Sequence, residues 1–276
     1  MSRMTPSPAS RRRLAGTGLS LVLALTGLPA AAAQGPTAAP DRAATAARRP
    51  ATAEERAAYD RSDPLSRSAF WAAQQQANPA DPVAGVKLAA ALRDLGQYDR
   101  AVEAAQQTLI VQPANVEAML ELGRANIARG QAFYGIAPLE QARAAAPRDW
   151  RPLSLLGVAY QQVRRTDEAR AVWNEGLRLA PDNPDILTNV GAALMAAGDA
   201  AGAETMLRRA VAQPGATLKM RLNLVLVVGL QGRMAEAEQM IRRDLPPEQA
   251  DRNLDWLRAQ TGGPAASTRT WGSVAG

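Results

Sequence analysis

The chain has 276 residues, of which 47% are hydrophobic, 21% are charged and only 4% are aromatic. It contains no cysteine and no histidine, which excludes disulfides, zinc sites built from these side chains, and catalysis by a thiol or an imidazole. The formal net charge is +6, but four of the 32 basic residues stand within the first 13 positions. The others nearly balance the 26 acidic residues, so we expect no nucleic-acid partner. No spacing of side chains suggests a metal site, a cofactor or an enzyme.

Residues 1–33 have the pattern of a signal peptide. Three consecutive arginines from Arg11 precede an apolar run over 14–28, and alanines offer a cleavage site near Ala33. This run is shorter than the ~20 residues that span a bilayer, which favours cleavage over a membrane anchor. We therefore predict a periplasmic protein with no membrane span after cleavage, exported by the secretory or the twin-arginine route. It is not expected to be a lipoprotein, because no cysteine can carry the lipid.

The two flanks of the central region lack apolar periodicity. Residues 34–62 are rich in Ala, Pro and Arg, and residues 261–276 are rich in Gly, Ser, Thr and Pro. Such compositions cannot bury enough apolar surface to fold, so we predict a disordered linker and a disordered tail. Trp271 is the one aromatic residue of that tail. The helical region between them is predicted to begin with a lone capping helix over 64–78.

In the central part of the chain, residues of the same kind recur every 34 positions. Prolines recur at this step, and so do residues whose side chains can accept bonds from the free N–H groups of a first helical turn. The prolines are Pro79, Pro113, Pro147 and Pro181, and the helix-starting residues are Asp81, Asn115, Asp149, Asn183 and Thr217. Glycines at the same step are expected to end first helices in the left-handed conformation: Gly96, Gly130, Gly198 and Gly232. The third unit has Arg164 there, so we expect its turn to be made differently.

Each unit is predicted to hold two helices, with small residues where they touch and large apolar residues in the remaining space. The small residues are Ala89, Gly123, Gly157 and Gly191 in first helices and Ala101, Gly135, Ala169, Ala203 and Ala237 in second helices. The large ones include Leu88, Leu122, Leu156, Val190, Leu224, Leu139, Trp173, Leu207 and Ile241. The predicted repeats are 82–115, 116–149, 150–183, 184–217 and 218–251. A C-terminal capping helix over 248–260 completes a helical domain of residues 63–260.

The third unit carries a specific resemblance. Leu153-x2-Leu156-Gly157-x2-Tyr160, then Ala169-x3-Trp173, then Pro181, resembles the consensus of the tetratricopeptide repeat (TPR). The resemblance implies an all-α fold, a TPR α-solenoid in which antiparallel helix pairs stack into a right-handed superhelix. It also implies a protein-binding scaffold, because the concave face of such arrays commonly holds a segment of a partner.

A second resemblance lies mainly towards the C-terminus. The segments that carry it are 63–71, 223–238, 243–247 and 253–258, which are similar to TadD-type proteins of the Flp/Tad pilus system. This implies a pilus assembly factor whose partner is a secretin or another pilus component. The alternative is a general periplasmic TPR scaffold for polysaccharide export or outer-membrane assembly. An enzyme with a TPR appendage is not expected, because the repeats, caps, leader and tails take up the chain.

The TPR resemblance places partner contacts at fixed points of the first helices. These points are Arg93, Glu117, Leu120, Arg124, Ile127, Arg151, Val158, Gln161, Gln162, Thr188, Asn189, Met195, Lys219, Leu222 and Asn223, with Asp94, Ser154, Asp185 and Leu226 beside them. An apolar floor is expected from Leu120, Ile127, Val158, Met195 and Leu222, and directional donors from Arg124, Arg151 and Gln162. Asn189 and Asn223 stand 34 residues apart. The family's clamp for a terminal carboxylate also needs Lys and Arg at set positions, and the full set is not present.

Overall fold

The computed structural model describes residues 50–262, which contain thirteen helices and no strand. The helices are α2 (Ala53–Asp60), α3 (Pro64–Ala77), α4 (Pro82–Asp94), α5 (Tyr98–Val111), α6 (Val116–Ala128), α7 (Phe133–Ala145), α8 (Trp150–Gln162), α9 (Thr166–Leu179), α10 (Pro184–Ala196), α11 (Ala200–Val211), α12 (Leu218–Leu230), α13 (Met234–Asp244) and α14 (Pro247–Gly262). The predicted signal peptide, the first part of the linker and nearly all of the tail lie outside the described residues.

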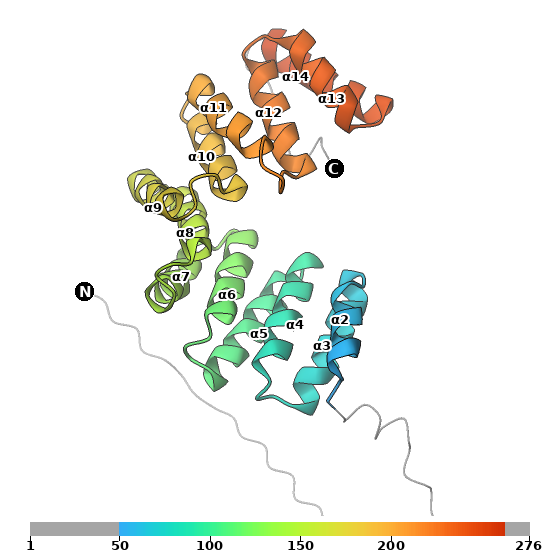
Figure 1. The fold of residues 1–276 in the computed structure, drawn as a ribbon, viewed down its shortest axis with the longest axis vertical. Helices are drawn as coiled ribbons and strands as arrows, with labels where there is room; N and C mark the ends of the chain where they lie inside the picture. The colour runs from blue at the N-terminus through green and yellow to red at the C-terminus, as the bar shows by residue number, and fades with distance from the viewer. Residues whose placement is uncertain (1–49, 263–276) are drawn as a thin grey trace, which may run out of the picture. The chain divides into compact units, whose positions relative to one another are not determined.

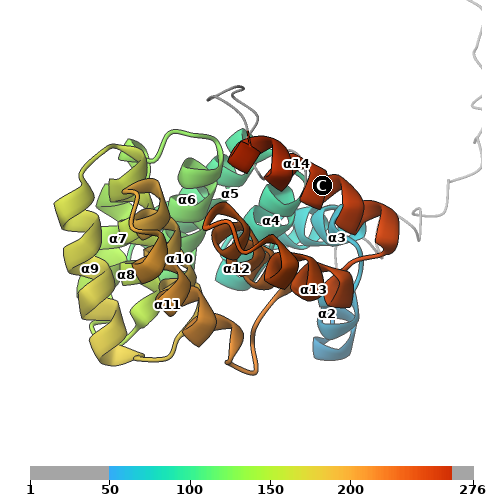
Figure 2. The ribbon, with the colours of Figure 1, turned by 90° about the horizontal axis from the view of Figure 1, so that it is seen from above.

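The helices form antiparallel pairs that follow one another in chain order (Figure 1). The pairs α4–α5, α6–α7, α8–α9, α10–α11 and α12–α13 each lie within one of the five repeat spans. Each helix packs on its neighbours in the chain, and the first helices of adjacent pairs also pack on one another. The view from above shows the pairs following one another along a curved path (Figure 2). The predicted all-α solenoid is therefore confirmed.

The beginnings of the first helices follow the predicted caps. The Asp81 carboxylate accepts hydrogen bonds from the N–H groups of Val83 and Ala84 at 3.0 and 3.3 Å. Corresponding bonds are made by Asn115, Asp149, Asn183 and Thr217. These side chains satisfy donors that a helix cannot pair within itself, which explains why the helix starts recur at the 34-residue step.

The turn after α8 corrects a prediction. The four expected glycines have positive φ, but so does Arg164, at 64°. The Arg164 N–H bonds the carbonyl of Gln161 at 3.1 Å, and the Arg165 N–H bonds that of Tyr160 at 2.8 Å. The Gly130 turn has the same pair of bonds, to Ile127 and Asn126. The third repeat therefore makes the same turn as the others, because the helices on either side impose it on a residue that disfavours it.

Replacing Arg164 by glycine is expected to stabilise the protein by about 1 kcal/mol. A side chain in the left-handed region costs about 1–2 kcal/mol, and the greater freedom of glycine in the unfolded chain offsets part of the gain. Arg164 is exposed, so the change removes no buried contact. Urea denaturation followed by circular dichroism measures the effect, and the reverse change at the equivalent turn, Gly198→Arg, should destabilise. Equal stability of Arg164→Gly and wild type would contradict this account.

The predicted linker is wrong over residues 53–60, which form α2. The helix begins at Thr52 with a capping box to Glu55. It is held on the array by an ion pair between Arg56 and Asp81 at 2.6 Å, and by a second between Asp60 and Lys87 at 2.8 Å.

Helix α2 also changes the interpretation of α3. One 34-residue step before α4, a first helix would cover 48–60, and α2 fills the second part of that span. The ring of Tyr59 on α2 stacks on Phe70 of α3, with centroids 4.0 Å apart. Hence α3 is the second helix of a shortened pair rather than a lone cap. At the other end, α14 runs two residues further than the predicted capping helix.

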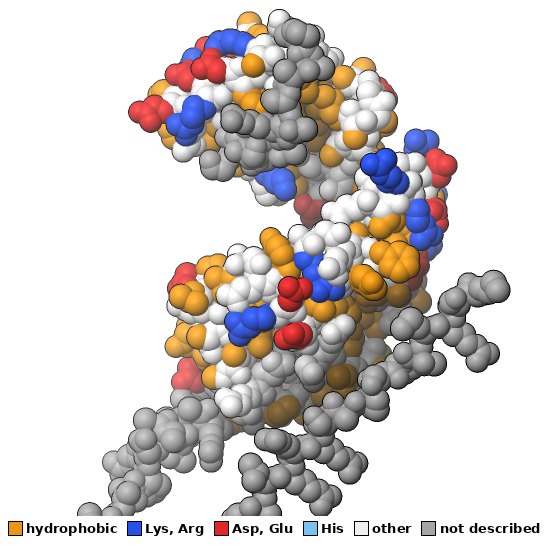
Figure 3. Space-filling model, turned by 180° about the vertical axis from the view of Figure 1, so that it is seen from behind, with side chains coloured by type: hydrophobic (Ala, Val, Ile, Leu, Met, Phe, Trp, Pro, Cys, Tyr) orange, Lys and Arg blue, Asp and Glu red, His pale blue; other side chains and the backbone are white. Residues whose placement is uncertain are grey.

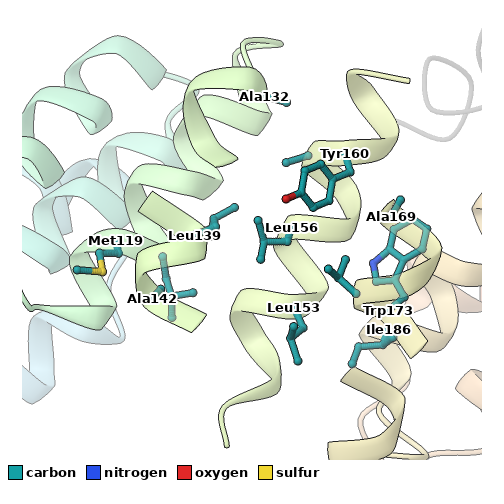
Figure 4. Close-up of a cluster of buried hydrophobic side chains, with 13 residues drawn as sticks. Met119, Ala132, Leu139, Ala142, Leu153, Leu156, Tyr160, Ala169, Trp173 and Ile186 are labelled. Atoms are coloured by element: carbon teal, nitrogen blue, oxygen red, sulfur yellow. The ribbon is translucent and has the colours of Figure 1, made fainter. Parts of the chain in front are cut away.

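The helix pairs pack as closely as the small residues imply. A Cβ atom built on Gly157 would lie 2.0 Å from Nε1 of Trp173, and one on Gly123 would lie 2.5 Å from Cδ2 of Leu139. Large side chains from the partner helices thus occupy the space next to each glycine. Figure 4 shows how such side chains, Leu139, Leu156, Trp173 and Ile186 from α7 to α10, follow one another through the core.

None of the helices within residues 50–262 has the length and apolar character needed to cross a bilayer.

Candidate partner-binding site

A hollow of 510 Å³ lies along the first helices of four consecutive repeats, α6, α8, α10 and α12. Its lining residues are Arg124, Trp150, Arg151, Ser154, Leu155, Val158, Asp185, Thr188, Asn189, Ala192, Thr217, Lys219, Met220 and Asn223. In the space-filling view, the surface is notched between the C-terminal helices at the top and the helices below, with side chains of both charges beside the notch (Figure 3).

Helical periodicity explains which side chains reach this hollow. On α8 they are Arg151, Ser154, Leu155 and Val158, and on α10 they are Asp185, Thr188, Asn189 and Ala192. Both sets follow the i, i+3, i+4, i+7 spacing of a single helix face. The opposite faces of these helices carry core residues such as Leu156 and Leu187, which are fully buried. One face of each first helix is therefore left for the hollow.

Uncharged polar groups occupy the middle of the hollow. The Asn189 amide donates a hydrogen bond to the Ser154 hydroxyl at 3.2 Å, which links α10 to α8. The Thr188 hydroxyl is buried and has no hydrogen-bond partner among the described residues. A buried polar group of this kind usually pairs with water or a ligand. Asn223 lies on the same lining, so two amides can offer both a donor and an acceptor to a peptide backbone.

The arginines of the hollow are held by carboxylates. Arg124 pairs with Glu121 at 2.5 Å, and Arg151 pairs with Asp149 at 2.6 Å and with Glu117 at 2.7 Å. The hydrogen bonds that Arg151 donates to Asp149 and Glu117 raise the pKa of Arg151 above its ordinary value. Each guanidinium is thus held in place by at least one carboxylate of the chain, and Arg124 shares Glu121 with Arg93. A partner's carboxylate would have to compete with these intramolecular pairs.

Lys219 differs from these arginines. It is exposed at the edge of the hollow on α12, and it forms no ion pair with any described residue. It is therefore the cation of the hollow most open to a negative group of a partner.

Stability is expected to depend on Asp149 in acid. Burial raises the pKa of Asp149, but hydrogen bonds from Arg151 outweigh burial and hold the pKa below its ordinary 3.8. The ion pair therefore contributes fully above about pH 4, and its contribution is lost as the pH falls through the lowered pKa. Asp149→Asn keeps the cap and removes the charge. Its unfolding free energy should be lower than that of wild type at pH 7, by up to about 1 kcal/mol.

Comparing the unfolding free energies of wild type and Asp149→Asn separates the effect of Asp149 from that of other carboxylates that titrate in the same pH range. The difference between wild type and Asp149→Asn, measured by urea denaturation at several pH values, should shrink below pH 4. A difference that stays constant from pH 7 to pH 2 would show that the Asp149 charge contributes nothing.

The predicted site residues fall into two groups. Those that line the hollow are Arg124, Arg151, Val158, Thr188, Asn189, Lys219 and Asn223, together with Ser154 and Asp185. Those elsewhere are Arg93, Asp94, Glu117, Leu120, Ile127, Gln161, Gln162, Met195, Leu222 and Leu226. Arg93 pairs with Asp94 and Glu121, and Glu117 lines a neighbouring groove. Gln161 lines a separate cleft between α9 and α10.

The expected apolar floor is wrong for the two leucines at its ends. Leu120 is completely buried, and Leu222 is 6% exposed, so both belong to the core. Ile127 and Met195 are partly buried and pack against the core clusters. Of the five expected floor residues, Val158 lines the hollow.

The sequence interpretation missed five lining residues, which are Trp150, Leu155, Ala192, Thr217 and Met220. Three of them could have been found, because Trp150, Leu155 and Ala192 stand four residues from Ser154, Arg151 and Thr188 on the same helix faces. Trp150 matters most, since it adds an aromatic wall beside the arginines. No group of three or more acidic side chains in the described part of the chain is placed to hold a metal ion.

Comparisons with known proteins agree with this architecture. The family model described as "Tetratricopeptide repeat" matches residues 86–133 and 154–218. No curated protein matches the chain in sequence. Among solved structures, TTC0263, a thermophilic TPR protein of Thermus thermophilus, is 25% identical, with a TM-score of 0.55, over 65% of this chain and 96% of that one.

Two more distant structures share the fold. PilW, a type IV pilus biogenesis factor, is 16% identical, with a TM-score of 0.59, over 74% of this chain and 92% of its own. The APC/C hetero-tetramer Cut9–Hcn1 is 12% identical, with a TM-score of 0.62, over 72% of this chain and 41% of the matched chain. With its helix pairs, its turns and the matching repeat model, the protein has the fold of a tetratricopeptide-repeat array.

Proposed function

We propose that this chain is an exported scaffold of the bacterial cell envelope that binds an extended segment of another protein in the hollow. In this proposal it acts as an assembly factor for a Tad/Flp-type pilus, and its partner is a secretin or another pilus component. The observation that carries the proposal is a hollow shared by four successive first helices and lined by both apolar side chains and directional polar groups.

The chemistry of the hollow suits a peptide. Trp150, Leu155, Val158 and Met220 give apolar surface, whose burial is worth about 25 cal/mol per Å². Asn189 and Asn223 lie on neighbouring first helices, and packed helices are about 10 Å apart. An extended chain rises about 3.3 Å per residue, so roughly three residues of a partner would bridge the two amides. The segment would thus meet one amide in each of the last two repeats.

The pilus assignment has separate support. The leader pattern over residues 1–33 supports export, and the segments similar to TadD-type proteins support the pilus system. PilW, a type IV pilus biogenesis factor, has the same fold over most of its length. That likeness concerns the fold, so the partner itself follows from the sequence resemblance.

Affinity capture from solubilised envelopes tests the proposal. The full chain without its leader is compared with Asn189→Ala/Asn223→Ala and with Arg124→Glu/Arg151→Glu. The control is Arg148→Glu/Arg178→Glu, a double charge reversal at exposed positions outside the hollow. Wild type and control should retain a secretin or another pilus protein, and both hollow variants should lose it while keeping their helix content.

The outcomes separate the possibilities. Capture of an unidentified protein alone does not support the proposal. Proteins of polysaccharide export or outer-membrane assembly in the eluate would replace the pilus assignment with the general scaffold. Equal capture by the hollow variants and the wild type would remove the hollow as the binding site.

A further inference from the structure

A second cleft lies between repeats three and four, outside the hollow. It has a volume of 330 Å³ and opens between α9 and α10. Its lining residues are Gln161, Thr166, Arg170, Trp173, Asn174, Val190, Ala193, Leu194, Ala196 and Ala197. Pockets for small ligands begin at about 300 Å³, so the cleft is large enough for one bulky group.

The 34-residue register explains why this junction is open. At the preceding junction, α7–α8, four apolar side chains belong to the core cluster or pack against it. One step later each of them is replaced by a smaller or a charged residue: Ile136 by Arg170, Leu156 by Val190, Tyr160 by Leu194 and Val163 by Ala197. Close packing leaves few voids larger than a water molecule in a protein interior. The cleft therefore follows from the smaller and charged residues at these four positions, and not from irregular packing.

The walls and the mouth of the cleft differ in chemistry. Trp173 is 3% exposed, and its indole N–H donates to the carbonyl of Ser154 at 3.1 Å, so that its polar atom is already satisfied. The walls of Val190, Ala193 and Leu194 are apolar. Arg170 lines the same cleft, is exposed, and forms no ion pair with any other residue in 50–262.

We propose that this cleft binds one bulky apolar side chain of a peptide whose adjacent carboxylate pairs with Arg170. The apolar walls accept a ring or branched chain the size of phenylalanine or leucine. The free guanidinium at the mouth complements a carboxylate and can hold it by two parallel hydrogen bonds. This site is separate from the hollow and does not depend on the function proposed for it, although α8 and α10 contribute to both.

Binding of model compounds to the full chain tests the proposal by NMR. The probe is N-acetyl-L-phenylalanine, and N-acetyl-L-phenylalaninamide lacks its carboxylate. The carboxylate probe should shift the Trp173 indole resonance saturably, with a dissociation constant on the order of 1 mM for so small a ligand. The amide should bind about fivefold more weakly, a ratio that corresponds to about 1 kcal/mol for the lost ion pair.

Variants assign the two parts of the site. Arg170→Gln should remove the difference between the two probes, whereas Arg178→Gln, on the same helix and outside the cleft, should preserve it. The pair Val190→Leu and Ala197→Val restores the residues of the preceding junction. It should abolish binding of both probes while the thermal midpoint stays the same or rises, because filling a cavity stabilises.

Three results would each overturn the proposal. The first is the absence of a saturable Trp173 shift in the wild type. The second is equal affinity for the acid and the amide. The third is a shift of Trp150 in place of Trp173, which would put the probe in the hollow. If the filled variant does not fold, Arg170→Gln still decides between the outcomes.

Discussion

Replacing Gly157 by alanine is expected to destabilise the folded protein by about 3 kcal/mol. The added Cβ would lie 2.0 Å from Nε1 of Trp173 and 2.2 Å from its Cε2, far inside van der Waals contact. Trp173 is almost fully buried and bonded to Ser154, so it cannot swing away without losing that bond. Overpacking of this kind usually costs about 1–3 kcal/mol, and a rigid buried ring places this case at the upper end. Urea denaturation followed by circular dichroism measures the loss.

A double-mutant cycle with Trp173→Ala shows whether the clash is direct. The first repeat already has this combination, with Ala89 and Ala105 at the equivalent positions, both buried. Trp173→Ala alone should cost about 3–5 kcal/mol. The double variant should cost at least about 1 kcal/mol less than the two single losses together, since residues in contact do not behave additively. Additive losses would mean that Gly157 is small for another reason.

Replacing Leu120 by alanine is expected to cost about 2–5 kcal/mol of unfolding free energy. Its side chain is completely buried in the cluster that contains Leu139 and Leu153, and truncation would leave a cavity there. The TPR resemblance placed this residue on the binding face, where truncation would alter affinity and leave stability nearly unchanged. The two assignments therefore make opposite predictions for one variant.

Leu155→Ala is the matched control for Leu120→Ala. Leu155 also lies on a first helix, but it is only partly buried and lines the hollow. Its truncation should cost clearly less, about 1 kcal/mol, because part of its surface already faces solvent. If Leu120→Ala abolished partner capture with an unchanged urea midpoint, the assignment of Leu120 to the core would be wrong.

The elements that repeat at the 34-residue step could be predicted because their signals are local. A cap such as Asp81 acts on the next three residues, and Gly157 is small because Trp173, 16 residues later in the same unit, takes its space. Such features are visible in a single sequence once the step is known.

Helix α2 was missed although it begins with a local signal, the capping box of Thr52 and Glu55. None of its residues is buried, so it lacks the core positions that mark the other described helices. Its stability comes from contacts with α3 and α4, such as the Arg56–Asp81 ion pair and the Tyr59–Phe70 stack. These contacts join residues that only the tertiary structure brings together.

Two predicted site residues lie in the core because the sequence pattern alone does not show how each side chain packs. Leu120, Ser154, Thr188 and Leu222 occupy the same position in four repeats. The short Ser154 and Thr188 line the hollow, whereas the longer Leu120 and Leu222 lie in the core clusters. A family position therefore specifies where a residue lies on the first helix. The size of its side chain then decides whether that residue packs in the core or lines the surface.

The equal spacing of the caps has a consequence for the length of the protein. Removing residues 116–149 would join Asn115 to Trp150, so that one observed helix cap would take over from Asp149. A whole unit can therefore be gained or lost without breaking the start of a helix. Because side chains from four successive first helices line the hollow, each such event would change its length. In the proposed function, the number of repeats would then set how long a partner segment the hollow accepts.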